Sequence, residues 1–272
     1  MKLSFTTLGC PEWDLDTIIR SAAEYGFDAI DFRGVGTEMN IYKLSAFSDS
    51  AQSTKKQIQA AGLRVSCFSS SVQLVSIEKF GDYLAEIEAY AKLCALFGTR
   101  YIRVFGGKIG DRDRAEALQA MVMHAERMGK IAKEYGAKLL LETHDDWTAC
   151  GEVKRFMEQV DTEAYGVLWD VHHPYRMLGE RPETTWEALG EWIDYVHVKD
   201  SLLTPDNPRG YQYCLLGEGD VPLRNIIEVL ERNGYNGYYT LEWEKKWHPD
   251  IEEPNVVFPH YVQKMRGMEQ EL

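Results

Sequence analysis

The stretch 134-EYGAKLLLETHDDW-147 decides the fold prediction, because a helical ending, a glycine and an apolar run follow one another in it. Glycine placed just past a helix adopts the left-handed conformation that ends the helix, so Gly136 marks this boundary. The apolar run after it predicts a buried strand over residues 137–143. This strand leads directly into Glu142, His144, Asp145 and Asp146. A hydrophobic strand that ends in ionisable groups indicates a functional site at its carboxyl end.

The same order of helix, glycine and β-rich run recurs along the chain. It reads EYGFDAIDF at Gly26, AAGLRVSCF at Gly62 and LFGTRYIRVF at Gly98, with fainter copies at Gly166 and Gly234. Each glycine is interpreted as the end of a helix and the beginning of a strand. The pattern predicts strands near residues 3–8, 28–33, 63–69, 99–105, 137–143, 165–170, 194–199 and 238–243.

Amphipathic segments separate these strands, and 82-DYLAEIEAYAKLCALFG-98 shows the helical spacing of apolar residues most plainly. Strands that alternate with helices predict a parallel sheet, and eight such units in 272 residues fit a closed (β/α)8 TIM barrel. A doubly wound sheet is the alternative, but no GxGxxG follows the first strand. No linker divides the chain, so we expect one α/β domain over residues 1–272.

Composition narrows the range of partners. The net charge of −13 argues against nucleic acid and anionic membranes as partners. No apolar run approaches the length of a membrane span, and the N-terminus lacks the apolar region of a signal peptide. The five cysteines are scattered without a CxxC pair, which favours a reducing compartment. We therefore expect a cytoplasmic protein that acts on a small molecule.

Polar residues end nearly every predicted strand, and in TIM barrels function lies at the carboxyl ends of the strands. The last four strands end in LLLETH, VLWDVHHP, YVHVKDS and LEWEKKW. Alternation along a strand places Glu142, Asp170 and Glu242 on the same faces as Leu140, Leu168 and Thr240. If those faces point inward, three carboxylates and one imidazole, that of His197, meet at the barrel mouth.

Carboxylates packed this closely repel one another, and a divalent cation relieves the repulsion. A set of oxygen ligands with one nitrogen suits one divalent ion, namely Mn²⁺, Mg²⁺, Co²⁺ or Zn²⁺. The sequence therefore predicts a metal site formed by Glu142, Asp170, His197 and Glu242.

From FTTLGCPEWDLD to LEWEKKWHPDIEEP, the chain resembles the xylose isomerase-like TIM-barrel superfamily, which includes sugar phosphate isomerases and epimerases. The single-metal site of that family falls on Glu142 in LETH, Asp170 in WDVHHP, His197 in HVKD and Glu242 in LEWE. The resemblance also implies that His173, three residues after the metal-binding Asp, contacts substrate. Homo-oligomers are common in the family, so an oligomer is possible.

The implied activity is that of an isomerase or epimerase acting on a sugar or a related polyhydroxy carbonyl compound. Glu142 and Glu242 would move a proton beside a metal-polarised carbonyl, through an enediolate. Lys199 at the end of strand seven, Glu218 in the long loop after it, and Arg103 at the end of strand four are further substrate-binding candidates.

Two departures from the ketose 3-epimerase pattern make that particular activity unsafe to infer. Thr148 and Leu203 stand where those enzymes have a second Glu and an Arg. The LETH motif, with His144, resembles 3-dehydroshikimate dehydratases of the same superfamily. The alternative function is therefore a metal-dependent lyase of the 3-dehydroshikimate dehydratase or inosose dehydratase type.

Other interpretations of the same residues remain. In these interpretations, Glu142 caps a helix and Asp170 caps a turn. His197 is then a buried core histidine, and Glu242 is a salt-bridge partner. An endonuclease IV-like enzyme would need a basic groove and more histidines than the seven present. A sugar-binding barrel without catalysis would leave the carboxylates without a cation.

Overall fold

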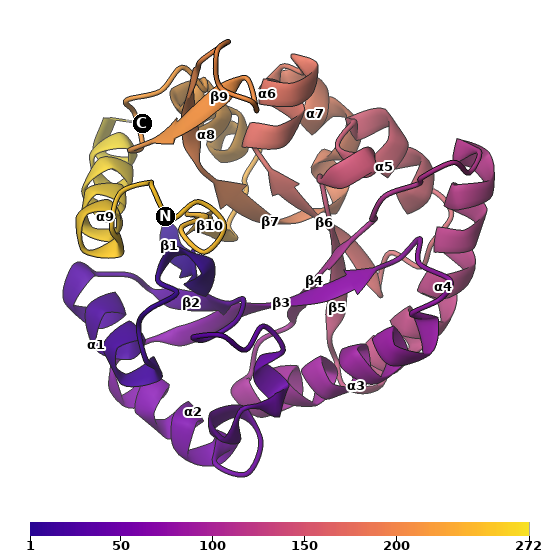
Figure 1. The fold of residues 1–272 in the computed structure, drawn as a ribbon, viewed down its shortest axis with the longest axis horizontal. Helices are drawn as coiled ribbons and strands as arrows, with labels where there is room; N and C mark the ends of the chain where they lie inside the picture. Colours follow the sequence, from indigo (N-terminus) through magenta and orange to yellow (C-terminus); the bar gives the residue numbers. More distant parts are fainter. Residues whose placement is uncertain (272) are drawn as a thin grey trace.

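A computed structural model describes residues 1–271, which form a closed barrel of parallel strands surrounded by helices (Figure 1). Around the barrel the order is β1-β10-β7-β6-β5-β4-β3-β2. The barrel strands are β1 (Lys2–Thr6), β2 (Ala29–Phe32), β3 (Arg64–Gln73), β4 (Tyr101–Phe105), β5 (Lys138–Glu142), β6 (Tyr165–Asp170), β7 (Ile193–Val198) and β10 (Tyr238–Leu241). The predicted (β/α)8 architecture is confirmed.

Helices cover the outside of the barrel. They are α1 (Leu15–Tyr25), α2 (Ala51–Ala60), α3 (Phe80–Phe97), α4 (Arg114–Glu134), α5 (Cys150–Met157), α6 (His172–Leu178), α7 (Pro182–Leu189), α8 (Leu223–Arg232) and α9 (Pro254–Glu271). Short 3-10 turns occur at Thr7–Gly9, Ile41–Lys43, Ser45–Phe47, Asp145–Trp147 and Gly190–Trp192. Within residues 1–271, no helix is both long enough and apolar enough to span a bilayer.

The glycine pattern marks helix ends as expected in most repeats. Gly26 follows α1 with φ 87° and Gly98 follows α3 with φ 74°, a conformation that side chains disfavour. Gly166 is different, because it lies inside β6. A Cβ atom there would come within 2.1 Å of a side-chain oxygen of Asp194, so this glycine allows close packing instead of ending a helix.

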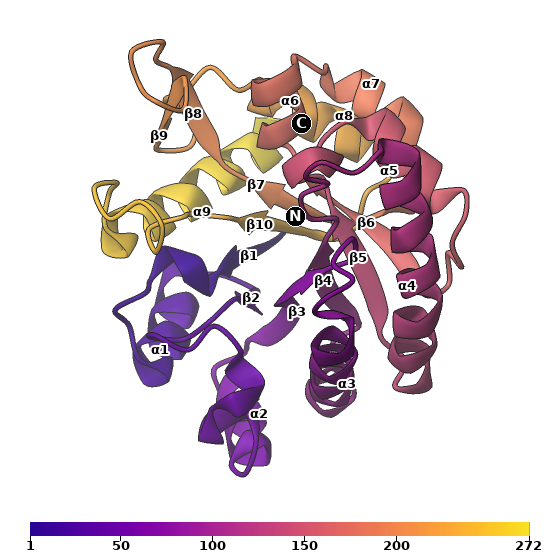
Figure 2. The same cartoon turned by 45° about the vertical axis from the view of Figure 1, so that its right-hand side comes forward.

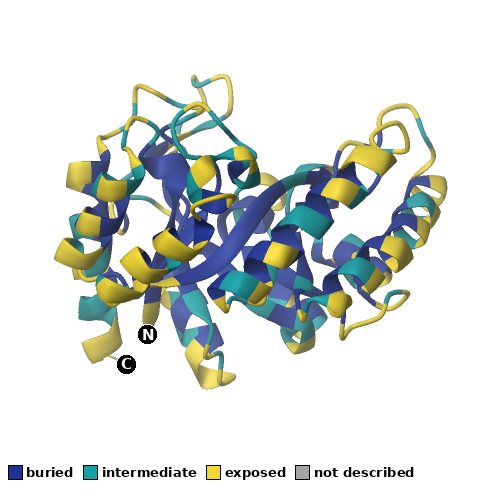
Figure 3. Ribbon diagram, turned by 90° about the horizontal axis from the view of Figure 1, so that it is seen from below, coloured by how far each residue is buried: buried dark blue, intermediate teal, exposed yellow. Residues whose placement is uncertain are grey.

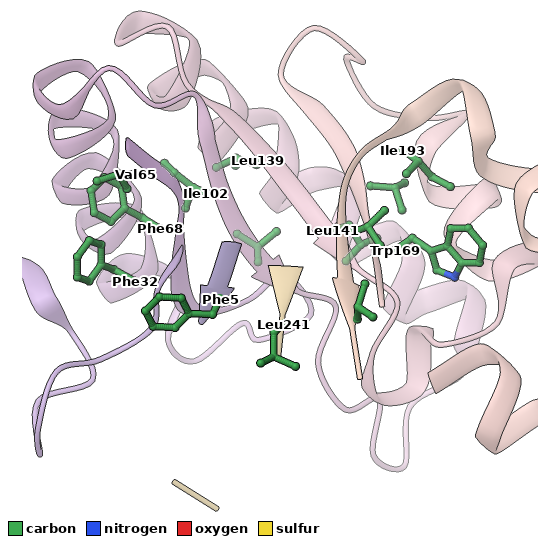
Figure 4. Close-up of a cluster of buried hydrophobic side chains, with 14 of the residues drawn as sticks. Phe5, Phe32, Val65, Phe68, Ile102, Leu139, Leu141, Trp169, Ile193 and Leu241 are labelled. Carbon is green, nitrogen blue, oxygen red and sulfur yellow. The ribbon is translucent and has the colours of Figure 1, made fainter. Parts of the chain in front are cut away.

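Two hydrophobic clusters lie on opposite sides of the strand wall. The large outer cluster fills the space between strands and helices, as Phe5, Leu141 and Trp169 illustrate (Figure 4). The small cluster consists of Cys67, Leu140, Leu168 and Tyr195. Side chains alternate along each strand, so the small cluster fills the barrel interior. Figure 3 shows the buried residues concentrated on the strands and on the inner faces of the helices.

An antiparallel hairpin interrupts the β/α repeat after β7. It consists of β8 (Asp200–Leu203) and β9 (Tyr211–Cys214), and it projects away from the barrel (Figure 2). The sequence predicted only a long loop here. The side chain of Asp200, buried at the base of the hairpin, accepts backbone N–H groups of Ser201, Gly217, Gly219 and Val221. This carboxylate therefore holds the chain that leads from the hairpin back to α8.

Candidate metal and active site

The last four strands of the barrel bring four ionisable side chains to one point. Glu142 and Asp170 are the final residues of β5 and β6, His197 is the penultimate residue of β7, and Glu242 follows β10 directly. The first three are fully buried and Glu242 is 6% exposed. Each offers one ligand atom, and these four atoms lie within 4.8 Å of one another. The sequence predicted that alternate side chains of these strands face the barrel interior, and this arrangement brings the four expected ligands together.

The cluster converges on one imidazole nitrogen. Nδ1 of His197 lies 3.3 Å from Oε1 of Glu142 and 3.3 Å from Oε1 of Glu242. Burial acts to lower the pKa of His197, but the surrounding carboxylates outweigh it and raise this pKa well above its ordinary value. Burial also raises the pKa of Asp170, to about 7. Three carboxylates and one imidazole are therefore crowded together in a buried part of the barrel mouth.

The donor atoms suit a divalent cation. Oε2 of Glu142 and Oδ2 of Asp170 are buried, and each lies beside one cationic side chain, Arg103 at 3.3 Å and Lys199 at 2.8 Å respectively. Buried carboxylate oxygens are costly unless a cation or a donor satisfies them. Three carboxylates with one imidazole form a ligand set that fits Mn²⁺, Mg²⁺, Co²⁺ or Zn²⁺.

Lys199 supplies a positive charge beside the cluster. Its Nζ atom lies 2.8 Å from Oδ2 of Asp170, 2.5 Å from Oε2 of Glu242 and 2.7 Å from Oε1 of Glu244. Burial opposes the charge on Lys199, but these carboxylates raise its pKa well above the ordinary value. The same cation outweighs the effect of burial on Glu242 and holds the pKa of that carboxyl well below its usual range. The structure thus places this predicted substrate-binding residue against two of the proposed metal ligands.

Arg103 has a corresponding position beside Glu142. Its Nη1 atom lies 3.3 Å from Oε2 of Glu142, and its guanidinium stacks on Phe105 at 3.8 Å from the ring centre. Burial and the nearby Glu242 raise the pKa of Glu142, but Arg103 and His197 outweigh them and lower it. Both Glu142 and Glu242 are therefore held as carboxylates, each with a cation on one oxygen.

A cavity of about 220 Å³ lies next to the cluster, since His173 in its lining contacts Asp170 and Glu244 contacts Lys199. Its lining consists of polar and aromatic side chains: His144, Asp145, His173, Met177, Tyr211, Tyr213, Glu244 and His248. The rings of His144 and His173 meet nearly edge to face, with centres 4.8 Å apart. Both predicted histidines thus lie where a small ligand would contact them. The hairpin contributes Tyr211 and Tyr213, which were not expected in the site.

A cavity of about 510 Å³ is larger but lies elsewhere, between α4 and residues 159–165, where Met123, Lys130 and Tyr165 are among its lining residues. The four clustered ligands line neither cavity, but His173 and Glu244, which line the smaller one, contact Asp170 and Lys199. These contacts, and not cavity size, locate the site. Glu218 is exposed in the turn before α8, and it is not among the residues that line the 220 Å³ cavity. The structure does not bring Glu218 to the cluster.

Two acidic residues lie at the site although the sequence did not predict a role for either of them. Asp31 in β2 is buried, and its Oδ2 lies 3.2 Å from Nε2 of His197. Glu244 accepts hydrogen bonds from Lys199 and from the hydroxyl of Tyr213. The sequence signal for Asp31 is a single charged residue in the otherwise apolar strand AIDF.

The fold and the cluster together define a (β/α)8 barrel with a candidate metal site at the carboxyl ends of its strands. The family model for the xylose isomerase-like TIM barrel matches residues 19–258. The chain belongs to this family, as the resemblance predicted.

Individual similarities are more distant. An inosose dehydratase of Bacillus licheniformis is 26% identical over 153 residues, which cover 51% of this chain and 50% of that protein. The chain thus spans about half the length of the curated relatives it matches. Among solved structures, a probable 3-DHS dehydratase, AsbF, from Bacillus anthracis superposes with TM-score 0.81 at 20% identity, covering 98% of this chain and 99% of that one.

Two further structures share the fold. The IolI protein, solved with a binding zinc atom, has TM-score 0.79 at 17% identity and covers 100% of this chain and 97% of its own. D-psicose 3-epimerase from Clostridium cellulolyticum H10 has TM-score 0.77 at 17% identity, with 99% of each chain covered. By their names, AsbF is a probable dehydratase and the Clostridium protein is an epimerase, so both reaction types occur among proteins that share this fold.

Proposed function

We propose that the protein is a divalent-metal-dependent isomerase or epimerase that acts on a small sugar or related polyhydroxy carbonyl compound. The observation that supports this most directly is the pair Glu142 and Glu242. These carboxylates come from β5 and β10, which β6 and β7 separate in the barrel, and yet both reach Nδ1 of His197. A carbon atom bound at this point would have a carboxylate on either side.

Glu142, Asp170, His197 and Glu242 would hold the ion, which is Mn²⁺, Mg²⁺, Co²⁺ or Zn²⁺. When bound, the ion polarises a substrate carbonyl and makes the neighbouring C–H bond acidic. The binding of zinc by the IolI protein supports a divalent ion in this fold.

Glu142 and Glu242 would then transfer the proton. In an isomerisation, one carboxylate would accept the proton from the carbon next to the carbonyl and return the same proton to the adjacent carbon. In an epimerisation, one carboxylate would accept the proton, and the other, which enters this step protonated, would donate its own proton to the opposite face. Both are ready to act as bases, because the cations of Arg103 and Lys199 favour their ionised forms. General acid–base catalysis of this kind contributes about 10²–10⁴-fold to a rate.

The cavity residues would bind and orient the substrate. His144 and His173 line the cavity, and Tyr211 and Tyr213 add aromatic surface suited to the apolar face of a sugar ring. Lys199 and Arg103 would act on the substrate mainly through the carboxylates that they hold.

A dehydratase is the second candidate, and His144 favours it. Asp145 lies 3.2 Å from Nδ1 of His144, and its hydrogen bond raises the pKa of this imidazole against the effect of burial. A protonated His144 in the cavity is placed to donate a proton to a departing hydroxyl. The similarity to an inosose dehydratase and to a probable 3-DHS dehydratase also supports this second function.

One experiment separates the two functions. Metal-loaded protein is incubated in deuterated water with ketoses, inososes and 3-dehydroshikimate, and products are followed by NMR. Deuterium entering carbon without loss of water supports the isomerase or epimerase. Loss of water supports the lyase, and no reaction with any member of the panel contradicts both.

A further inference from the structure

Asp31 reaches the proposed metal site from the opposite side of the barrel. It lies in β2, and two strands, β1 and β10, stand between β2 and β7. Its side chain is fully buried, and its contact with His197 therefore crosses the barrel interior. The two residues are 166 positions apart in the chain.

Both carboxylate oxygens of Asp31 are engaged. The hydroxyl of Ser69 donates to Oδ1 at 2.8 Å, and Nε2 of His197 lies 3.2 Å from Oδ2. Among residues 1–271, no Lys or Arg forms an ion pair with Asp31, and its only ion-pair contact is His197. A buried carboxylate is retained at such a place only when a partner compensates its charge.

The geometry assigns Asp31 as the residue that positions His197 for metal binding, an inference that rests on the proposed metal site. A neutral imidazole carries its proton on one nitrogen and a lone pair on the other. Asp31 accepts a hydrogen bond from Nε2–H, which leaves the lone pair on Nδ1. Nδ1 is the nitrogen that faces Glu142 and Glu242.

Two effects follow for the ligand. The hydrogen bond fixes the tautomer and the ring orientation, and the negative charge of Asp31 makes the imidazole a stronger donor to a cation. Loss of such a partner of a metal-binding histidine costs about 10–100-fold in metal affinity. Ser69 in turn fixes the carboxylate of Asp31. Ser69 therefore orients Asp31, and Asp31 orients His197.

The test compares Asp31→Asn and Asp31→Ala with the matched control Glu86→Gln. Glu86 is also a buried acid, but it accepts the backbone N–H of Ser71 and does not contact His197. Zn²⁺ affinity is measured by chelator competition, and the ring nitrogens of the zinc-loaded proteins are examined by ¹H–¹⁵N NMR, with His197→Gln to assign the signal. Thermal unfolding of the metal-free proteins verifies that each variant folds.

We expect the wild-type protein to show a protonated Nε2 and a zinc-bound Nδ1 on His197. Asp31→Asn should bind Zn²⁺ about 10-fold more weakly and Asp31→Ala about 100-fold more weakly, while Glu86→Gln stays within twofold. A folded Asp31→Ala with wild-type affinity and the same ring signals would overturn the role of Asp31 alone. Failure of the wild-type protein to bind Zn²⁺ would overturn this role together with the proposed function.

Discussion

The Nζ atom of Lys199 lies 2.5 Å from Oε2 of Glu242, and both side chains are shielded from solvent at the barrel mouth. Removing one member of a buried ion pair leaves the other charge uncompensated, which costs about 3–5 kcal/mol. We predict that Lys199→Met lowers the free energy of unfolding of the metal-free protein by this amount. Urea denaturation with and without Mn²⁺ measures it, and Mn²⁺ should restore part of the loss.

An exposed ion pair provides the control for Lys199. Lys130 pairs with Glu126 on α4, and both side chains are 70% exposed. Lys130→Met should change the free energy of unfolding by less than about 1 kcal/mol, because solvent screens surface pairs. Equal small losses in Lys199→Met and Lys130→Met would contradict a central role for the buried cation.

The two proposed proton-transfer residues are tested by Glu142→Gln and Glu242→Gln. Each variant keeps the side-chain shape but removes a base and a charged ligand, so the turnover number should fall at least 10²–10⁴-fold, or the metal should be lost. Glu218→Gln is the control, because Glu218 is exposed outside the cavity lining, and it should retain nearly wild-type rates. Steady-state kinetics and metal analysis distinguish the two effects, and wild-type turnover in either site variant would remove that residue from the mechanism.

Metal binding should depend on pH through two ligands. Both must lose a proton to bind a cation, and in the metal-free protein the pKa of Asp170 is about 7 and that of His197 is well above its ordinary value. Because Asp170 is protonated at pH 6 and ionised at pH 8, each bound ion should displace more protons at pH 6 than at pH 8. The affinity for Mn²⁺ consequently falls as the pH is lowered, most steeply below pH 7. Calorimetry in buffers of different ionisation enthalpy counts these protons, and a constant count of zero would contradict the cluster as the binding site.

The base of the hairpin should depend on Asp200. Asp200→Ala leaves four backbone N–H groups without their acceptor, which should lower the free energy of unfolding by on the order of 3 kcal/mol. Gly219→Ala should also destabilise, since a Cβ atom there would come within 2.0 Å of Oδ1 of Asp200. Denaturation midpoints measure both, and a loss below about 0.5 kcal/mol in Asp200→Ala would be contrary to this account.

The strands and the ligand cluster were predictable because both depend on local patterns. Period-two alternation placed Leu140 and Glu142 on one face, and parallel strands bring their carboxyl ends together. The hairpin was not predicted, because the segment 200–214 gives only a turn-rich stretch followed by YQYC, and a pair of short strands is hard to tell from a loop.

Local sequence patterns could not predict which residues contact the proposed metal ligands. Asp31 and His197 meet only because the barrel closes, and nothing near Asp31 in the sequence indicates a partner on β7. Lys199 and Arg103 were expected to contact substrate. Their distances to Glu242 and Glu142 become visible only in the folded chain.

The proposed metal site is tested most directly by anomalous diffraction from crystals grown with Mn²⁺. The account predicts one manganese peak per chain, in contact with Glu142, Asp170, His197 and Glu242, and its absence in crystals of His197→Gln. A peak elsewhere, or none while these four side chains keep their present arrangement, would contradict the metal-dependent function.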